Sequence, residues 1–286
     1  MSDNMRIGVV GAGTMGNGIA QAFAMAAHPV VMVDVDQKFL DRGLATVKKS
    51  LSKLAEKGRM TPQDAEQVLG RISVSLRLED CGNCGLVVEA ASEDVGVKKA
   101  LFARLDKACR PDAILATNTS TISVTEIAAA TGRPDKVVGM HFMNPVPLMK
   151  LVEVVKGLAT APETVQTIVA LAEKLGKAPV VVNDSPGFVS NRVLLPMINE
   201  AVFALEEGVA GAEAIDTVMK LGMNHPMGPL ALADLIGLDV CLNIMEVLHA
   251  GFSDSKYRPC PLLRQLVAAG RLGRKTGRGF YEYPAG

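Results

Sequence analysis

The amino-acid sequence predicts an α/β protein in which a doubly wound, mainly parallel sheet is followed by a smaller all-helical domain. Short apolar runs alternate with amphipathic segments as far as residue 183. These runs are apolar on both faces, as in a parallel sheet that is covered by helices on each side. Beyond the turn residues Asp184-Ser185-Pro186-Gly187 only helical periodicity remains. We therefore expect two domains, at residues 1–184 and 185–286.

The elements of the first domain follow from apolar runs and helix start signals. The runs that we interpret as strands are Arg6–Gly11, Val30–Asp34, Ile72–Ser75, Leu86–Ala90, Ala113–Thr117, Val137–Phe142, Leu151–Val155 and Val180–Val182. Thr61 as a cap, with Pro62 at the first helical position and Asp64 three residues after the cap, predicts one helix start. The other predicted helices are Gly16–Ala27, Gln37–Lys57, Val97–Cys109, Val124–Thr131 and Glu163–Leu175.

The second domain has helical periodicity throughout. It predicts helices at Phe188–Glu207, Ala212–Leu221, Leu230–His249 and Pro261–Ala269. About 100 residues this rich in Leu, Val and Met carry more apolar surface than one small core needs. We therefore expect this domain to bury apolar surface against the first domain or against a second subunit.

Composition excludes several classes of protein. The 286 residues are 49% hydrophobic, which is enough for a substantial core. Thirty basic residues balance thirty acidic ones, so no overall field favours nucleic acid or an anionic membrane. The sequence shows no apolar stretch of membrane-spanning length and no secretory signal pattern, so we expect a cytoplasmic protein without a membrane partner.

The five cysteines do not indicate a disulfide framework, because their number is odd. Cys81 and Cys84 have C-x-x-C spacing, which also occurs in metal and redox sites. No second pair is present to complete a zinc site, and the pair precedes a strand, whereas redox pairs open a helix. We interpret the segment as a plain turn and expect no metal.

A glycine-rich turn at the first strand predicts a dinucleotide site. Gly11-Ala12-Gly13-Thr14-Met15-Gly16 follows a strand and opens a helix, as in Rossmann-type folds. Gly11 allows the tight turn, Gly13 lets a pyrophosphate approach the main chain, and Gly16 lets the helix pack closely. Asp34, at the end of the second strand, would bind both ribose hydroxyls and repel a 2′-phosphate. These features favour NAD over NADP, although Lys38 lies close by in the sequence.

Polar residues also gather where two later strands end. Thr117-Asn118-Thr119-Ser120-Thr121 follows an apolar strand, at the edge where open α/β sheets bind ligands. The alternative is a loop that only caps the next helix. His141 ends another apolar strand, and Glu153 lies within the strand that follows. A carboxylate among Leu and Val is costly to bury alone, so we expect it to meet His141 as a general-base pair.

The sequence resembles the 3-hydroxyacyl-CoA dehydrogenase family, especially its short-chain 3-hydroxybutyryl-CoA members, from Ile7 to Tyr283. The similarity rests on Gly11–Gly16, Val88-Glu89-Ala90, Thr117–Thr121, His141–Pro147, Lys150–Val154, Asp184–Phe188, Asn191-Arg192 and Gly273–Tyr281. The resemblance implies an NAD-dependent oxidoreductase that interconverts (3S)-3-hydroxyacyl-CoA and 3-ketoacyl-CoA. It also implies a homodimer formed by the helical domain.

The resemblance further implies roles for individual residues. His141 would be the base and Glu153 its orienting acid, and Ser120 and Asn191 would be hydrogen-bond donors to the substrate. Asn144 would lie near the nicotinamide and the substrate carbonyl. Cofactor contacts would come from Gly11, Gly13, Thr14, Met15, Gly16, Asp34, Glu89, Lys98, Ser120, Asn144 and Lys275. Substrate contacts would come from Ser50 and Lys57, which would touch the CoA phosphates, together with Ser120, Asn144 and Asn191.

The sequence departs from the family pattern at Thr117, where many relatives carry Ser, and over the variable segment Ala91-Ser92-Glu93-Asp94. Two other functions stay open. One is a dehydrogenase of a free hydroxy acid, although such relatives use a Lys where this chain has Asn191. The other is an NAD-binding protein without activity, which the presence of both His141 and Glu153 disfavours.

Overall fold

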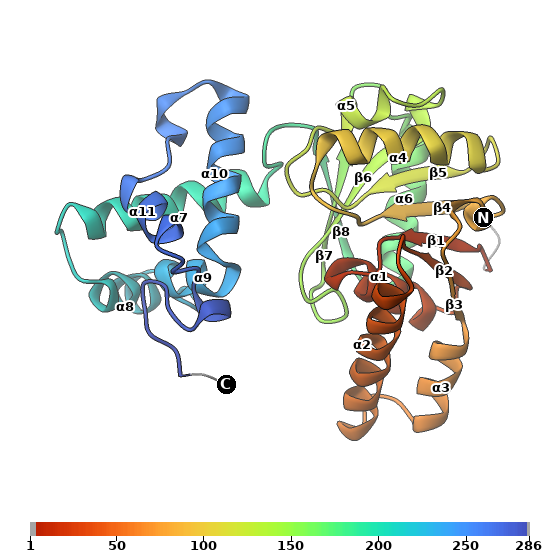
Figure 1. The fold of residues 1–286 in the computed structure, drawn as a ribbon, viewed down its shortest axis with the longest axis horizontal. Helices are drawn as coiled ribbons and strands as arrows, with labels where there is room; N and C mark the ends of the chain where they lie inside the picture. The colour runs from red at the N-terminus through yellow and green to blue at the C-terminus, as the bar shows by residue number, and fades with distance from the viewer. Residues whose placement is uncertain (1–3, 285–286) are drawn as a thin grey trace. The chain divides into compact units, whose positions relative to one another are not determined.

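The computed structural model describes residues 4–284 (Figure 1). The chain divides into two compact units, Met1–Asp184 and Ser185–Gly286. Within the described residues, no helix combines the length and apolar character needed to cross a membrane.

The first unit is built on one sheet of eight strands in the order β3-β2-β1-β4-β5-β6-β7-β8. β6 and β7 are antiparallel, and the other neighbouring pairs are parallel. The order reverses between β1 and β4, which is the switch point where doubly wound sheets bind ligands. The strands are β1 (Ile7–Val10), β2 (Val30–Val33), β3 (Ile72–Ser75), β4 (Leu86–Glu89), β5 (Ile114–Thr117), β6 (Val137–Phe142), β7 (Leu151–Lys156) and β8 (Ala178–Asn183).

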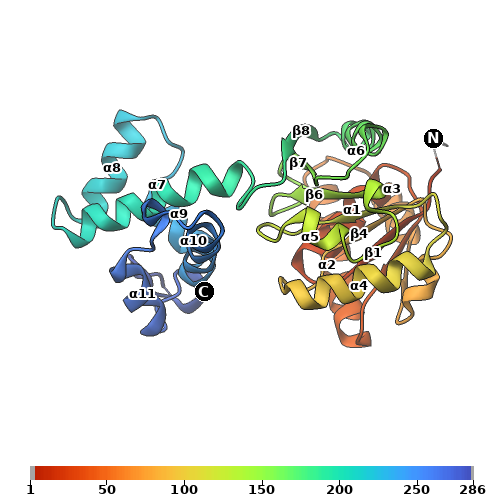
Figure 2. The ribbon, with the colours of Figure 1, turned by 90° about the horizontal axis from the view of Figure 1, so that it is seen from above.

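Helices cover both faces of this sheet (Figures 1 and 2). One face packs on the first three helices and the sixth, and its core includes Phe23, Leu40, Val68 and Ile168. The opposite face is covered by the fourth and fifth helices. The helices are α1 (Thr14–Met25), α2 (Gln37–Glu56), α3 (Pro62–Gly70), α4 (Val95–Ala108), α5 (Val124–Ala128) and α6 (Pro162–Lys174), with 3-10 turns at Leu78–Cys81 and Pro134–Lys136.

Side-chain caps fix where several of these helices begin. Thr61 accepts a hydrogen bond from the main-chain N–H of Asp64, and the Asp64 carboxylate accepts one from that of Thr61. The predicted helix start at Thr61 is therefore confirmed. Asp36 caps α2 and Asp94 caps α4 in the same way, through the N–H groups of Lys38 and Val97.

The second unit is helical, as predicted, with α7 (Ser190–Glu206), α8 (Ala212–Gly222), α9 (Pro229–Ile236), α10 (Leu238–Phe252) and α11 (Pro261–Ala268), and 3-10 turns at Ser255–Tyr257 and Arg274–Thr276. The single helix expected over Leu230–His249 was wrong. Gly237 has φ 106°, a value that the helix cannot contain, and it separates α9 from α10.

Two buried carboxylates fasten residues 280–283 to this unit. Asp234 accepts hydrogen bonds from the main chain of Phe280 and Tyr281 and from the Tyr283 hydroxyl. Asp216 accepts from the first turn of α9 and from the Tyr281 hydroxyl. Both carboxylates are almost fully buried, and these donors offset the cost of desolvating them.

Candidate active site

The glycine-rich turn between β1 and α1 leaves the main chain open on one side. Gly11 has φ +102°, and a Cβ there would meet the Ala90 carbonyl oxygen at 2.5 Å. A Cβ on Gly16 would overlap the Gly11 carbonyl oxygen, so α1 can pack this close only with glycine. A Cβ on Gly13, by contrast, would meet nothing within 4 Å. The turn therefore offers an uncovered main chain at the start of α1, as a pyrophosphate requires.

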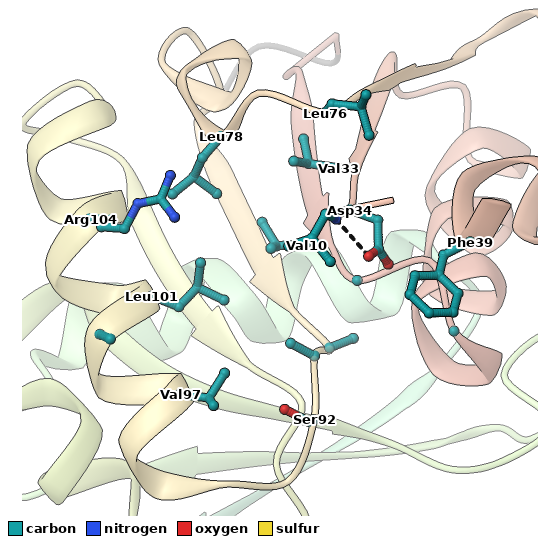
Figure 3. A pocket seen from close by; sticks show the side chains of 16 residues that line it. Val10, Val33, Asp34, Phe39, Leu76, Leu78, Ser92, Val97, Leu101 and Arg104 are labelled. Atoms are coloured by element: carbon teal, nitrogen blue, oxygen red, sulfur yellow. Dashed lines mark hydrogen bonds between the residues drawn. The ribbon is translucent and has the colours of Figure 1, made fainter. Parts of the chain in front are cut away.

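Asp34 stands beside this turn at the end of β2. One carboxylate oxygen accepts a hydrogen bond from the Ala12 N–H at 2.7 Å, and the other accepts one from the Val35 N–H, also at 2.7 Å. Asp34 borders a cleft of about 780 Å³ whose other walls are largely apolar (Figure 3). The wall residues include Val10, Val33, Val35, Phe39, Leu76, Leu78, Val97 and Leu101. An apolar cleft with a carboxylate at its rim suits the adenosine of a dinucleotide.

This arrangement fits NAD on structural grounds. The main chain of residues 11–16 would hold the pyrophosphate and Asp34 the ribose. Thr14 and Met15 form the first turn of α1, at its positive end.

Glu89 is the last residue of β4, and Lys98 lies in the first turn of α4. Their side chains are 0% and 1% exposed, and the Lys98 Nζ is 2.6 Å from Glu89 Oε1. Glu89 also accepts hydrogen bonds from the Ala91 N–H and from the Thr117 hydroxyl, both at 2.7 Å. Neither residue is among those that line the cleft. Their contact with the cofactor stays a prediction.

Glu93 is a residue that the sequence interpretation missed. Its Oε1 accepts hydrogen bonds from the Thr119 hydroxyl at 2.6 Å and from the Ser120 N–H at 2.8 Å. The Ser120 hydroxyl also donates to it, at 3.2 Å, and Lys98 lies 3.3 Å from Oε2. Burial raises the pKa of Glu93, but the Lys98 charge and these hydrogen bonds outweigh it and hold the pKa below its ordinary value. Glu93 is therefore ionised at neutral pH.

His141 and Glu153 are brought together by the sheet itself. They are directly opposite each other in the antiparallel register of β6 and β7. The His141 Nδ1 is 2.8 Å from Glu153 Oε2, and the two residues are only 7% and 2% exposed. Nearby, the Asn118 side-chain oxygen accepts a hydrogen bond from the Phe142 N–H at 3.0 Å. The loop after β5, which carries Ser120, is thus tied to the strand that carries His141.

The remaining predicted site residues lie elsewhere in the two units. Asn144 is exposed in the loop after β6, and Ser50 and Lys57 lie along α2 and at its C-terminal cap. Asn191 is in the first turn of α7, in the second unit. Lys275, also in the second unit, forms an ion pair of 2.6 Å with Asp239.

Cys81 and Cys84 are buried free thiols at the 3-10 turn before β4. Across residues 4–284, no group of three or more His, Cys, Asp or Glu is placed to hold a metal ion.

Known families and structures match nearly the whole length of the chain. Residues 6–185 match the NAD binding domain of 3-hydroxyacyl-CoA dehydrogenase, and residues 187–283 match its C-terminal domain. A probable 3-hydroxybutyryl-CoA dehydrogenase of Bacillus subtilis is 60% identical over 97% of each chain. The Clostridioides difficile 3-hydroxybutyryl-CoA dehydrogenase is 52% identical, over 98% of this chain and 99% of its own.

A solved structure agrees with these matches. The crystal structure of (S)-3-hydroxybutyryl-CoA dehydrogenase from Ralstonia eutropha superposes with a TM-score of 0.96 at 51% identity, over 99% of this chain and 100% of that chain. Both units are covered, and the residues around the glycine-rich turn fit NAD. The chain therefore belongs to the 3-hydroxyacyl-CoA dehydrogenase family of NAD-dependent oxidoreductases.

Proposed function

We propose that the protein interconverts (3S)-3-hydroxybutyryl-CoA and acetoacetyl-CoA, with His141 and Glu153 as its acid–base pair. The short-chain substrate is supported by the names of relatives at 52–60% identity. The chemistry is supported above all by the 2.8 Å contact between the two buried side chains. NAD supplies the hydride acceptor or donor at C3 of the substrate, and the residues of the chain supply position and proton transfer.

Glu153 fixes the state of the histidine ring in this proposal. As a carboxylate it accepts a hydrogen bond from the Nδ1–H group, so Nε2 of the neutral ring is the nitrogen that removes the 3-hydroxyl proton. The positive ring that results is stabilised by the carboxylate behind it. In the direction of reduction, Nε2 returns the proton to the oxygen on C3. The pair thus needs no other carboxylate to complete a general base.

Ser120 would position the 3-oxygen of the substrate, with its own orientation set by Glu93. Glu93 accepts a hydrogen bond from the Ser120 N–H at 2.8 Å and contacts the Ser120 hydroxyl at 3.2 Å, so it fixes the loop that presents this hydroxyl. The 3-hydroxyl of the reduced substrate gives its one proton to His141, so Ser120 would act as a hydrogen-bond donor to the 3-oxygen, as the resemblance implies. We keep Asn191 as a proposed substrate-positioning residue on the resemblance alone.

The CoA moiety would bind along α2, through Ser50 and Lys57. The two residues are seven positions apart, about two turns, so they lie on one side of the helix. Lys57 is exposed and can reach a phosphate without being desolvated first.

We also propose that the helical unit forms a homodimer. Val218 and Leu221 on α8, and Met223 just after it, are 62%, 83% and 61% exposed, which is costly for apolar side chains in water. Leu221→Glu should weaken the dimer. The molar mass measured by light scattering should then fall from that of two chains towards that of one. The control is Lys220→Glu, which changes charge on the same helix, and equal masses for all three proteins would contradict the proposal.

One experiment separates this function from the two alternatives. We expect NADH consumption with acetoacetyl-CoA, less with long-chain 3-ketoacyl-CoAs and none with free acetoacetate. Turnover of free acetoacetate in preference to the CoA ester would indicate a hydroxy-acid dehydrogenase. NADH binding without turnover of any CoA ester would indicate a binding protein without activity.

A further inference from the structure

The loop at residues 143–150, which joins His141 on β6 to the strand of Glu153, is held by a lysine from outside the site. Lys177, between α6 and β8, donates from Nζ to the Val146 carbonyl at 2.5 Å and to the Met149 carbonyl at 2.8 Å. Within the loop, the N–H groups of Leu148 and Met149 both donate to the Pro145 carbonyl. One ammonium group thus binds the outer turn of the loop at two points.

Val146 is held from its other side by the cofactor-binding helix. Its side chain is 2% exposed and lies against Gly18 of α1, where an added Cβ would come within 2.9 Å of the Val146 Cβ. The absence of a side chain at Gly18 therefore makes room for Val146. Lys177 holds the main chain of the same residue, so the loop is fixed between α1 and the α6–β8 turn.

We propose that Lys177 is a positioning residue for the reaction, because it fixes the loop that carries Asn144 and follows His141. This inference rests on the proposed function, in which Asn144 lies near the nicotinamide and the substrate carbonyl. Lys177 itself would touch neither substrate nor cofactor. Its ammonium restricts the loop to the one position in which Val146 fits against Gly18.

The chemistry of the contact explains why a lysine suits this place. Two main-chain carbonyls oppose the ammonium, and hydrogen bonds with a charged donor are stronger than neutral ones. Lys177 is partly buried, and burial lowers its pKa from the ordinary value. Methionine has a similar length and shape but offers no donor, so Lys177→Met removes both bonds and leaves the packing of the stem. Arginine keeps a charged group that can donate to two carbonyls.

The test compares Lys177→Met, Lys177→Arg and a control, Lys107→Met, on the exposed face of α4. With acetoacetyl-CoA and NADH, Lys177→Met should lower kcat about 10- to 100-fold, as expected when reacting groups are misplaced by about 1 Å. The dissociation constant of NADH should stay within about twofold, because the turn at residues 11–16 and Asp34 are untouched. Lys177→Arg should recover most of the activity, and Lys107→Met should match the wild type.

Hydrogen exchange measured by mass spectrometry tests the inference without any turnover. In Lys177→Met, the peptide that contains Leu148 and Met149 should exchange faster than in the wild type, with little change in peptides from α4. Unchanged exchange in this peptide would overturn the inference, as would a kcat within twofold of the wild type. A wild-type protein inactive on acetoacetyl-CoA would contradict the proposed function, and the exchange result would still decide whether Lys177 fixes the loop.

Discussion

The two halves of the candidate site are built from different parts of the chain. The nucleotide half consists of main-chain groups in one continuous turn, residues 11–16, with a single carboxylate at Asp34. The proton-transfer half consists of the His141–Glu153 pair on β6 and β7, together with a second buried set of side chains from β4, β5 and α4. A short motif therefore describes the first half almost completely, whereas the second depends on residues up to 64 positions apart, from Glu89 to Glu153.

The two halves also differ in the kind of substitution that would destabilise them. Gly11 and Gly16 are needed because no side chain fits there, so the nucleotide half depends on space. Glu89, Lys98, His141 and Glu153 are buried polar groups, and each must be paired to be tolerated. The proton-transfer half therefore depends on complete pairing, and within each pair the loss of one partner should disturb the other.

The largest expected effect is that of His141→Gln. Positioned acid–base catalysis usually contributes about 10²–10⁴ in rate, so kcat should fall by that factor. NADH binding should survive, since Gly13 and Asp34 are unchanged. Steady-state kinetics and a fluorescence titration with NADH would measure the two effects. A large loss of NADH affinity would show that the two halves are not independent.

Glu89→Gln should affect stability more than cofactor binding. It leaves the buried Lys98 without its close partner, and breaking a buried ion pair costs about 3–5 kcal/mol. The Lys98–Glu93 contact at 3.3 Å should reduce this loss. Urea unfolding would measure it, with the exposed Glu56→Gln on α2 as the control. A stable variant that has lost NADH affinity would support Glu89 as a direct cofactor contact.

Much of the fold could be predicted from periodicity, but contacts that depend on tertiary placement could not. The apolar pattern runs through Leu230–His249 without a gap, so it hides the break that Gly237 makes with its positive φ. Glu93 lies in a polar segment that looks like a solvated loop. Its position just beyond β4, at the edge where ligands bind, was the signal that could have identified it. His141 and Glu153 were predictable as a pair because a carboxylate within an apolar strand needs a partner.

Asp34→Ser should weaken the preference of the nucleotide half for NADH over NADPH. The carboxylate would repel a 2′-phosphate at close range, and its loss should reduce kcat/KM with NADH more than with NADPH. A change of about tenfold in the NADH-to-NADPH ratio is expected for one such charged hydrogen bond. If the wild type already uses both cofactors equally, Asp34 does not set the preference, and Lys38 becomes the residue to change.

The smallest expected effect is that of Lys57→Ala, outside both halves. An exposed charge pair contributes up to about 1 kcal/mol, so the apparent KM for acetoacetyl-CoA should rise no more than about fivefold. The KM for NADH should not change. Lys48→Ala is the matched control, because Lys48 is exposed and lies nine positions before Lys57, on the other side of α2. An equal rise in KM for NADH would indicate a general effect on the fold.

A double-mutant cycle on His141 and Glu153 tests the central claim most directly. Glu153→Gln should keep the ring in place but remove the charge that orients and stabilises it, so it should also lower kcat strongly. Because groups that act as a unit are not additive, kcat of the double variant should be little lower than that of His141→Gln alone. Losses that multiply fully in the double variant would contradict the claim and leave Glu153 as a structural carboxylate.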